Sequence, residues 1–262
     1  MTISSTPPQR TSPATDYDPR WLEEHLAGEK RSASVLSEIR EAVFGAQDGL
    51  TSVLAVVSTV GGATGESYPV LIAGLAATLA GVFSMAAGEY MSSKSQREIF
   101  EAQIAQEAAE VQERPGEAEA EVAYLLQRDG LSPEAAMNVA RQLATNKNVL
   151  LKTMVEKELG LAVEEDANAL RGALVMGGSF GLAALVPILP YVLLPVSNAL
   201  YVSVALAACV LFGMGVVKSR WTRRHWLRSG AEIFALGAVA GIAGYFFGTL
   251  LPAALGVAGV SG

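Results

Sequence analysis

Residues 42–93 read AVFGAQDGLTSVLAVVSTVGGATGESYPVLIAGLAATLAGVFSMAAGEYMSS, and only Asp48, Glu66 and Glu89 among them are charged. A helix that crosses the hydrocarbon core of a bilayer needs about 20 predominantly apolar residues. The block is therefore long enough for two spans, and the stretch at 61–69, rich in glycine and ending in proline, separates them. The two spans are expected near residues 42–62 and 69–92.

Two more apolar blocks lie in the second half of the chain. Residues 172–217 and residues 233–262 carry no charged side chain. Three prolines divide the first of these blocks into two spans, and the second block is long enough for one. The chain is thus predicted to be an all-α membrane protein with five transmembrane helices. The last three spans are expected near residues 169–187, 197–217 and 230–251.

Basic residues mark one side of this predicted bundle. Lys and Arg precede span one, follow span two, precede span three and fill the loop between spans four and five, whereas the other loops carry none. Short cytoplasmic flanks are enriched in Lys and Arg. The N-terminus and the segment 94–168 are therefore expected in the cytoplasm.

The first 40 residues are predicted to form a separate polar region. Residues 1–19 are rich in Thr, Ser and Pro, so we expect a disordered tail without the apolar core of a secretory signal. Within residues 20–40, apolar side chains such as Leu22 and Leu26 recur among charges. This pattern predicts either an amphipathic helix at the inner membrane face or a solvated connector.

The segment 94–168 is predicted to be a cytosolic, acidic insert, with 15 Asp and Glu against eight Lys and Arg. Glycine, proline and a Ser-Pro-Glu start signal divide it into three helices, near 94–113, 117–129 and 133–159. The chain accordingly divides into a tail with the amphipathic helix, spans one and two, the three-helix insert, and spans three to five. These regions cover residues 1–40, 41–93, 94–168 and 169–255.

Some glutamates of the insert project onto apolar helix faces. At 100° per residue, Glu107 falls within the apolar stripe of the first helix and Glu110 borders it. In the third helix, Glu158 projects onto the apolar stripe, with Met154 one turn before it. An unpaired buried carboxylate is costly, and a divalent cation would neutralise several of them. A solvated acidic hairpin with ordinary surface glutamates is the equally weighted alternative.

The second helix of the insert offers two further candidate ligands. Glu117 and Glu121 lie four residues apart and share a helix face, and we rank Glu121 above Glu117. Carboxylate oxygens suit Mn²⁺ and Fe²⁺, and a methionine sulfur favours Fe²⁺ over Ca²⁺ or Mg²⁺. The insert is therefore predicted to bind a divalent metal.

Three polar or sulfur-bearing side chains lie inside the predicted spans. Asp48 lies about two turns into span one, where an ionised carboxylate is a functional candidate. Met85 and Glu89 lie on one face of span two. A cation passing these residues would meet several weak oxygen and sulfur sites, as transport requires. The alternative for Asp48 is a structural carboxylate whose polar atoms are satisfied within the packed helices. The alternative for Glu89 is a carboxylate at the membrane interface that contacts water.

Composition excludes several other functions. A net charge of −7 disfavours nucleic acid as a partner. The single cysteine, Cys209, cannot form an intramolecular disulfide. Ferritin-like iron oxidases use Glu-x-x-His pairs, but both histidines, His25 and His225, lie outside the insert. A membrane-anchored, ferritin-like iron-binding or oxidase protein is therefore the less favoured alternative.

Three segments together resemble the vacuolar iron transporter family. They are REAVFGAQDGL at 40–50, SMAAGEYMS at 84–92, and the glutamate-rich insert that closes with ELGL at 158–161. The resemblance covers roughly residues 36–255 and implies a five-span homodimer that exports Fe²⁺, and often Mn²⁺, from the cytosol in exchange for protons. It also implies a pathway between the two first spans and an insert that binds metal before delivery.

Matched position by position, the resemblance implies that Asp48 and Met85 form a membrane metal site. It assigns insert ligands to Glu107, Glu110, Glu121, Met154 and Glu158. The chain departs from some members in having Met154-Val155 where they have two methionines, and its second-helix glutamates stand at 117, 119 and 121.

We therefore expect a divalent metal transporter rather than an enzyme. No cofactor is expected, because Fe²⁺ or Mn²⁺ is the substrate. Asp48 and Glu89 can each hold a cation or a proton, which is the simplest chemistry for proton antiport. The expected partners are divalent metal ions, the lipid bilayer and a second copy of the chain, since recurring small residues allow close helix approach. The expected location is a bacterial plasma membrane.

Overall fold

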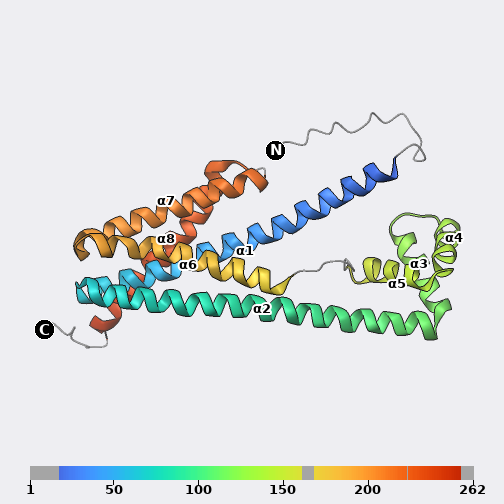
Figure 1. The fold of residues 1–262 in the computed structure, drawn as a ribbon, viewed down its shortest axis with the longest axis horizontal. Coiled ribbons are helices and arrows are strands. Elements are labelled where there is room, and N and C mark those ends of the chain that lie inside the picture. The colour runs from blue at the N-terminus through green and yellow to red at the C-terminus, as the bar shows by residue number, and fades with distance from the viewer. Residues whose placement is uncertain (1–17, 161–167, 223, 255–262) are drawn as a thin grey trace.

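The structure is a computed structural model that describes residues 18–160, 168–222 and 224–254. Within these ranges the chain is all-helical and has no strand (Figure 1). The helices are α1 (Pro19–Thr64), α2 (Ser67–Glu113), α3 (Pro115–Arg128), α4 (Pro133–Ala144), α5 (Lys147–Glu158), α6 (Ala169–Leu193), α7 (Val196–Thr222) and α8 (Trp226–Ala254).

Four of these helices are long and apolar enough to cross a membrane, in the part of the chain that the structure describes. They correspond to the first four predicted spans. The predicted fifth span, 230–251, lies within α8, which is helical but is not among the four, so this span stays a prediction. The four helices contain Glu38–Thr64, Ser67–Glu113, Ala169–Leu193 and Val196–Arg220.

Helix α1 differs from the prediction at its N-terminal end. It runs without a break from Pro19 to Thr64, so residues 20–40 are not a separate helix lying along the membrane surface. The sequence contains no proline between positions 20 and 64 to interrupt the helix. Leu26 and Leu36 are more than half exposed on this extension. Of the predicted disordered tail, residues 1–19, residues 1–17 lie outside the described residues, and Asp18 and Pro19 form the N-cap and the first position of α1.

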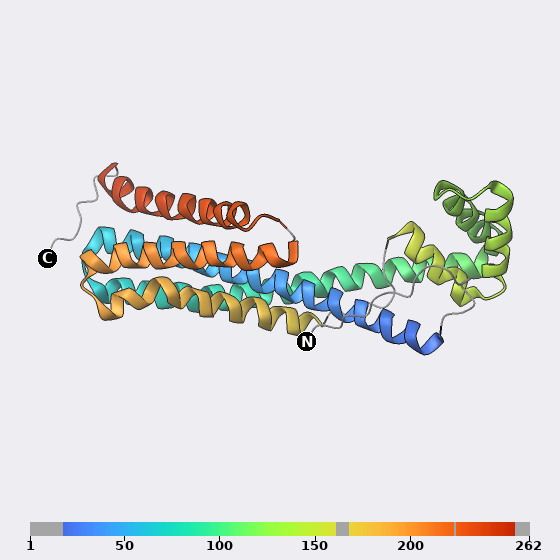
Figure 2. The ribbon, with the colours of Figure 1, turned by 90° about the horizontal axis from the view of Figure 1, so that it is seen from above.

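Helix α2 is also longer than predicted. The expected insert helix at 94–113 is the polar half of a single 47-residue helix. At a rise of about 1.5 Å per residue, this helix is about 70 Å long, more than twice the thickness of a hydrocarbon core. The polar half therefore extends beyond the apolar half and carries the rest of the insert at its far end (Figures 1 and 2).

Prolines 187 and 190 do not end α6, contrary to the prediction that they separate spans three and four. The helix continues through both to Leu193, and the break falls at Leu194 and Pro195. Proline is tolerated within membrane helices because neighbouring helices and hydroxyl side chains satisfy backbone groups. Ser203 Oγ of α7 donates a hydrogen bond to the carbonyl oxygen of Pro187, at 2.7 Å.

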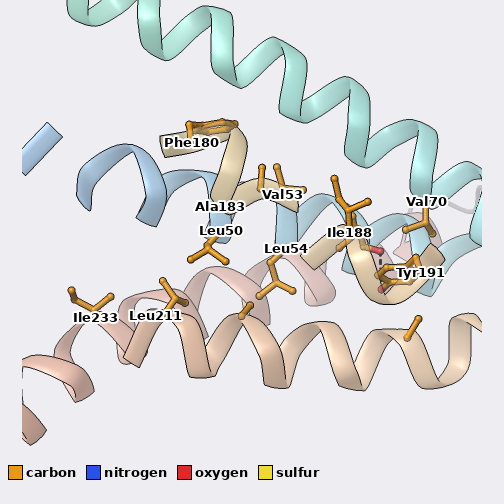
Figure 3. Packing of buried hydrophobic residues seen from close by; sticks show 14 residues of the cluster. Leu50, Val53, Leu54, Val70, Phe180, Ala183, Ile188, Tyr191, Leu211 and Ile233 are labelled. Atoms are coloured by element: carbon orange, nitrogen blue, oxygen red, sulfur yellow. Dashed lines mark hydrogen bonds between the residues drawn. The ribbon is translucent and has the colours of Figure 1, made fainter. Parts of the chain in front are cut away.

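The membrane bundle is centred on the packing of α6 against α1 and α2. Leu50 and Val53 of α1, Phe180 and Tyr191 of α6, and Leu211 of α7 are buried in one apolar cluster (Figure 3). The Tyr191 hydroxyl donates to the backbone carbonyl oxygen of Val57, at 3.4 Å. This contact joins α1 and α6 near their C-terminal ends.

Glycines allow these helices to approach closely within one chain. A Cβ at Gly49 would collide with the backbone of Phe180, and a Cβ at Gly81 would collide with the Phe180 ring. Gly74 lies against Val57 and Ile188 in the same way. Gly74 and Gly81 of span two are therefore occupied by contacts within the chain, whereas a Cβ at Gly88 would meet no atom within 4 Å.

The insert folds back on the end of α2 through three short helices. Arg114 separates α2 from α3, and Pro115 stands at the first turn of α3, where its missing N–H costs nothing. Asp129 follows α3, and Lys157 of α5 donates a hydrogen bond to its carboxylate. Lys147 Nζ donates to Gln112 Oε1 of α2, at 2.6 Å. These contacts fix α5 against α2 and the end of α3.

The predicted third helix of the insert, 133–159, is two helices. The Asn146 side chain caps α5 by accepting from the N–H groups of Asn148 and Val149. The break changes the angular phase between α4 and α5, so a single projection over 133–159 is not valid. The buried apolar residues of the insert core come from α2, α3, α4 and α5: Val111, Ala118, Val122, Ala123, Leu126, Ala136, Ala140, Leu150 and Met154.

Candidate functional site

Carboxylates gather where the polar end of α2 meets α3. Glu107 and Glu110 lie on the last two turns of α2, and Glu117 and Glu121 lie on the first two turns of α3. The chain reverses at Arg114, which brings the two pairs together. The apolar core of the insert fixes the two helices that carry these glutamates, because Val111 of α2 and Val122 of α3 are both buried in it.

Three of these glutamates form the closest cluster, which we call the carboxylate cluster: Glu110, Glu117 and Glu121. One carboxylate oxygen of each lies within 4.8 Å of one oxygen of each of the others. Glu110 and Glu121 are half-buried and Glu117 is exposed. Oxygens at this spacing need only small side-chain movements to coordinate one ion at the 2.0–2.6 Å that divalent cations adopt.

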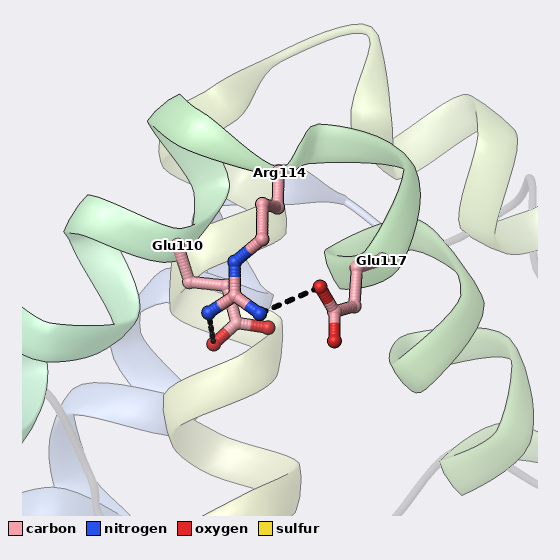
Figure 4. Close-up of polar contacts among 3 residues, drawn as sticks. All are labelled: Glu110, Arg114 and Glu117. Atoms are coloured by element: carbon pink, nitrogen blue, oxygen red, sulfur yellow. Dashed lines mark hydrogen bonds and ion pairs between the residues drawn. The ribbon is translucent and has the colours of Figure 1, made fainter.

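Arg114 reaches into the carboxylate cluster from the junction of the two helices (Figure 4). Its Nη1 is 2.7 Å from Glu117 Oε2, and its Nη2 is 3.5 Å from Glu110 Oε2. The Arg114 side chain is 57% exposed, so solvent weakens both ion pairs. Within the described chain, Glu110 Oε1 is buried and has no hydrogen-bond partner. The guanidinium thus contacts one oxygen of Glu110, and among the described residues only the carboxyl group of Glu121, when protonated, can donate a further hydrogen bond to Glu110.

Glu121 of the carboxylate cluster and neighbouring Glu107 bind protons more tightly than ordinary glutamates do. Burial, the charges of Glu110 and Glu158, and hydrogen bonding with Glu110 raise the pKa of Glu121 to about 7. Burial and the charges of Glu158 and Glu110 also raise the pKa of Glu107 above its usual range. Burial is the main cause of both shifts, and the neighbouring negative charges add to it.

The structure confirms some of the predicted orientations and corrects another. Glu107 is inward, with 8% of its surface exposed, and Met154 is fully buried. Glu158 is exposed, contrary to the prediction, although it lies four residues after buried Met154 on the same face of α5, because it is the last residue of the helix. Its charge nevertheless acts on Glu107 and Glu121, so Glu158 borders the group of carboxylates from the solvent side.

Asp48 lies in the membrane half of the molecule and is half-buried on α1. Thr51 and Ser52 donate to its backbone carbonyl oxygen rather than to its carboxylate. No described basic side chain lies within ion-pair distance of Asp48. An acidic group inside a span without a counter-charge is an available ligand for a cation or a proton.

Met85 and Glu89 lie on α2, which packs beside α1 on α6. Met85 packs against the apolar cluster of the membrane bundle and is half-buried. Glu89 Oε1 accepts a hydrogen bond from Ser93 Oγ, at 2.7 Å. Glu89 is therefore a partly buried, hydrogen-bonded carboxylate near the point where the apolar half of α2 gives way to its polar half.

Glu41 is a buried carboxylate that the sequence analysis missed. Only 9% of its surface is exposed. A Cβ at Gly172 of α6 would lie 3.0 Å from Glu41 Oε2 and 3.4 Å from Glu89 Oε1, so both carboxylates lie beside this glycine. The signal for Glu41 was its position seven residues before Asp48, which puts both on one face of α1.

Comparison with known proteins identifies similar chains over most of this length. The model of the VIT family matches residues 39–249. Vacuolar iron transporter 2 of Oryza sativa subsp. japonica is 32% identical over 225 residues, which is 86% of this chain and 90% of that protein. Vacuolar iron transporter 1 of Arabidopsis thaliana is 33% identical over 208 residues, or 79% and 83% of the two chains. The vacuolar iron transporter of Plasmodium falciparum (isolate 3D7) is 28% identical over 223 residues, or 81% and 82%.

Proposed function

The chain belongs to the VIT family of multi-pass membrane transporters of metal ions, and from this premise we propose that it exports Fe²⁺, with Mn²⁺ as a second substrate, in exchange for protons. The relatives named vacuolar iron transporter support iron as a substrate. Mn²⁺ is included because carboxylate ligands accept both ions.

The observation that carries this proposal is the carboxylate cluster of Glu110, Glu117 and Glu121. Three carboxylates within 4.8 Å of one another, with one buried oxygen unpartnered, are costly unless a divalent cation binds there. Glu107 lies on the same helix end and Glu158 borders the group, so the local negative charge extends beyond the three. The insert thus captures the ion from the cytosol and raises its concentration near the bundle.

The pathway across the bilayer is proposed to pass Glu41, Glu89, Met85 and Asp48. Glu41 and Glu89 flank Gly172 at the inner end of the bundle, and Asp48 lies two turns farther along α1 than Glu41. Each site offers few ligands, which allows the ion to leave again. Asp48 and Glu89 bind protons when the metal has left, and this exchange couples export to proton entry.

Two copies of the chain are proposed to enclose this pathway, with the insert and the N-terminus on the cytoplasmic side. The basic clusters flank the inner ends of the spans and support this orientation. Within the described bundle, Asp48 is only half-buried, so a second first span would complete its surroundings. The proposed location is a bacterial plasma membrane.

The proposal is tested by reconstituting the purified protein into liposomes. A dye inside the liposomes reports Mn²⁺ or Fe²⁺ entry, and a second dye reports internal pH. We expect metal entry to be accelerated by an acidic interior and to be accompanied by proton exit. Metal entry no faster than in empty liposomes would contradict transport, and metal entry without any proton movement would contradict antiport.

A further inference from the structure

Arg114 is the one basic side chain of the described insert that contacts two members of the carboxylate cluster. It stands at the junction of α2 and α3, and its own N–H donates to the Glu110 carbonyl oxygen. This backbone position lies between the helix that carries Glu110 and the helix that carries Glu117. The guanidinium therefore lies beside the oxygens that a metal would use.

We propose that Arg114 is a built-in competitor of the divalent ion, and that metal enters and leaves the carboxylate cluster by exchanging with the Arg114 guanidinium. The proposal rests on the proposed function, in which the cluster binds metal. In the structure, the guanidinium neutralises Glu110 and Glu117 in part and holds the two helices together. When a divalent ion binds, the guanidinium moves into the solvent.

The contacts of Arg114 have the strength that such an exchange requires. Its side chain is 57% exposed, so it can move into water without losing a buried environment. The two ion pairs are exposed enough to be weak, and the 3.5 Å pair to Glu110 is long for a hydrogen bond. A fully buried guanidinium would instead have closed the cluster to metal.

The oxygen of Glu110 that Arg114 does not contact favours bound metal over the guanidinium. Glu110 Oε1 is buried and, among the described atoms, has no hydrogen-bond partner as long as the neighbouring Glu121 is ionised, whereas Oε2 faces Arg114. A divalent ion placed among the three carboxylates could coordinate the oxygen that Arg114 leaves unsatisfied. Metal loading is therefore favoured over the guanidinium contact, and Arg114 reduces this advantage so that the ion can be released toward the bundle.

The test measures Mn²⁺ binding to the full-length protein in detergent by calorimetry at neutral pH. We expect Arg114→Gln to bind Mn²⁺ about fivefold more tightly than wild type, and to release it more slowly to a chelator, because one competing charge is gone. Arg114→Lys keeps the charge and is expected to stay close to wild type.

Arg141→Gln is the matched control. Arg141 is a comparably exposed arginine of the insert, and its partner is Glu119, at 3.6 Å, which lies outside the carboxylate cluster. The control removes the same charge from the same segment and is expected to change Mn²⁺ affinity less than Arg114→Gln does.

Four results would contradict the proposal or the metal site on which it rests. Arg114→Gln binding Mn²⁺ as wild type does, or more weakly, would show that Arg114 only holds the helices together. Arg114→Lys binding as tightly as Arg114→Gln would show that charge is not the cause. If the wild-type protein binds no Mn²⁺, the proposed metal site does not exist. If Glu121→Gln weakens Mn²⁺ binding and Arg114→Gln leaves it unchanged, the metal site stands and only the role of Arg114 is contradicted.

Discussion

The membrane bundle and the insert both contain buried or half-buried carboxylates, but they arrange them differently. In the bundle, Glu41, Asp48 and Glu89 are few and are spread over turns of α1 and α2. In the insert, Glu110, Glu117 and Glu121 lie within 4.8 Å of one another. Clustered ligands favour tight capture, whereas separated ligands favour passage. The predictions below test whether binding and transport divide between the two regions in this way.

The largest effect is expected from Asp48→Asn in the bundle. The amide keeps the shape of the side chain but neither carries a negative charge nor exchanges a proton, so Mn²⁺ uptake into liposomes should fall about 100-fold. Mn²⁺ binding by the insert should be unchanged. Glu98→Gln, which removes an exposed carboxylate from α2, is the matched control. Normal uptake by Asp48→Asn would remove Asp48 from the pathway and with it the proposed division.

A smaller effect is expected from Glu121→Gln in the insert. The loss of one charged ligand, worth roughly 2 kcal/mol, should weaken Mn²⁺ binding about 30-fold. Uptake should be slower than in wild type at low Mn²⁺ concentration and equal to wild type at saturating Mn²⁺. The reason is that the bundle, which carries the ion across the membrane, is unchanged. Glu156→Gln, at an exposed glutamate that pairs with Lys152, should bind as wild type does. Uptake that stays low at saturating Mn²⁺ would show that capture and passage are not separate.

The two regions should also differ in their response to pH. The pKa of Glu121 is about 7, so Mn²⁺ affinity of the insert should fall about tenfold per pH unit below 7, as a proton replaces the metal. Calorimetry over a pH series measures this slope, and Glu121→Gln should flatten it. A slope that Glu121→Gln leaves unchanged would assign the proton to another group.

The raised pKa of Glu121 also predicts how the stability of the metal-free insert depends on pH. The pKa of Glu121 is higher in the folded protein than the ordinary value of 4.5, so the folded state holds its proton more tightly. Stability should therefore decrease as the pH rises from about 4.5 to about 7 and level off above that range. Bound Mn²⁺ should remove this loss by stabilising the deprotonated carboxylates.

The smallest effect is expected from Glu158→Gln. Glu158 is exposed and acts on Glu107 and Glu121 through its charge, so its loss should weaken Mn²⁺ binding only about threefold. The resemblance to vacuolar iron transporters instead implies that Glu158 is a ligand. A loss as large as that of Glu121→Gln would show that Glu158 turns inward when metal binds.

The sequence by itself determined the parts of the molecule that depend on local pattern. Long runs without charge are typical of membrane helices or a buried core, and the polar segment between them was predicted to lie outside the membrane. The inward position of Glu107 was also predictable, because α2 is uninterrupted and the 100° projection holds along it.

Only the tertiary structure decided where α4 and α5 point and what surrounds each carboxylate. The break at Asn146 divides the predicted third helix, and Glu158 is exposed because it is the last residue of α5, although it shares a helix face with buried Met154. Glu41 and Glu89 meet at Gly172, which lies far from both in the sequence, and Arg114 meets Glu117 because α3 folds back on α2. Helix propensity and periodicity act over a few turns, whereas these contacts depend on how separate helices pack, so no local pattern specifies them.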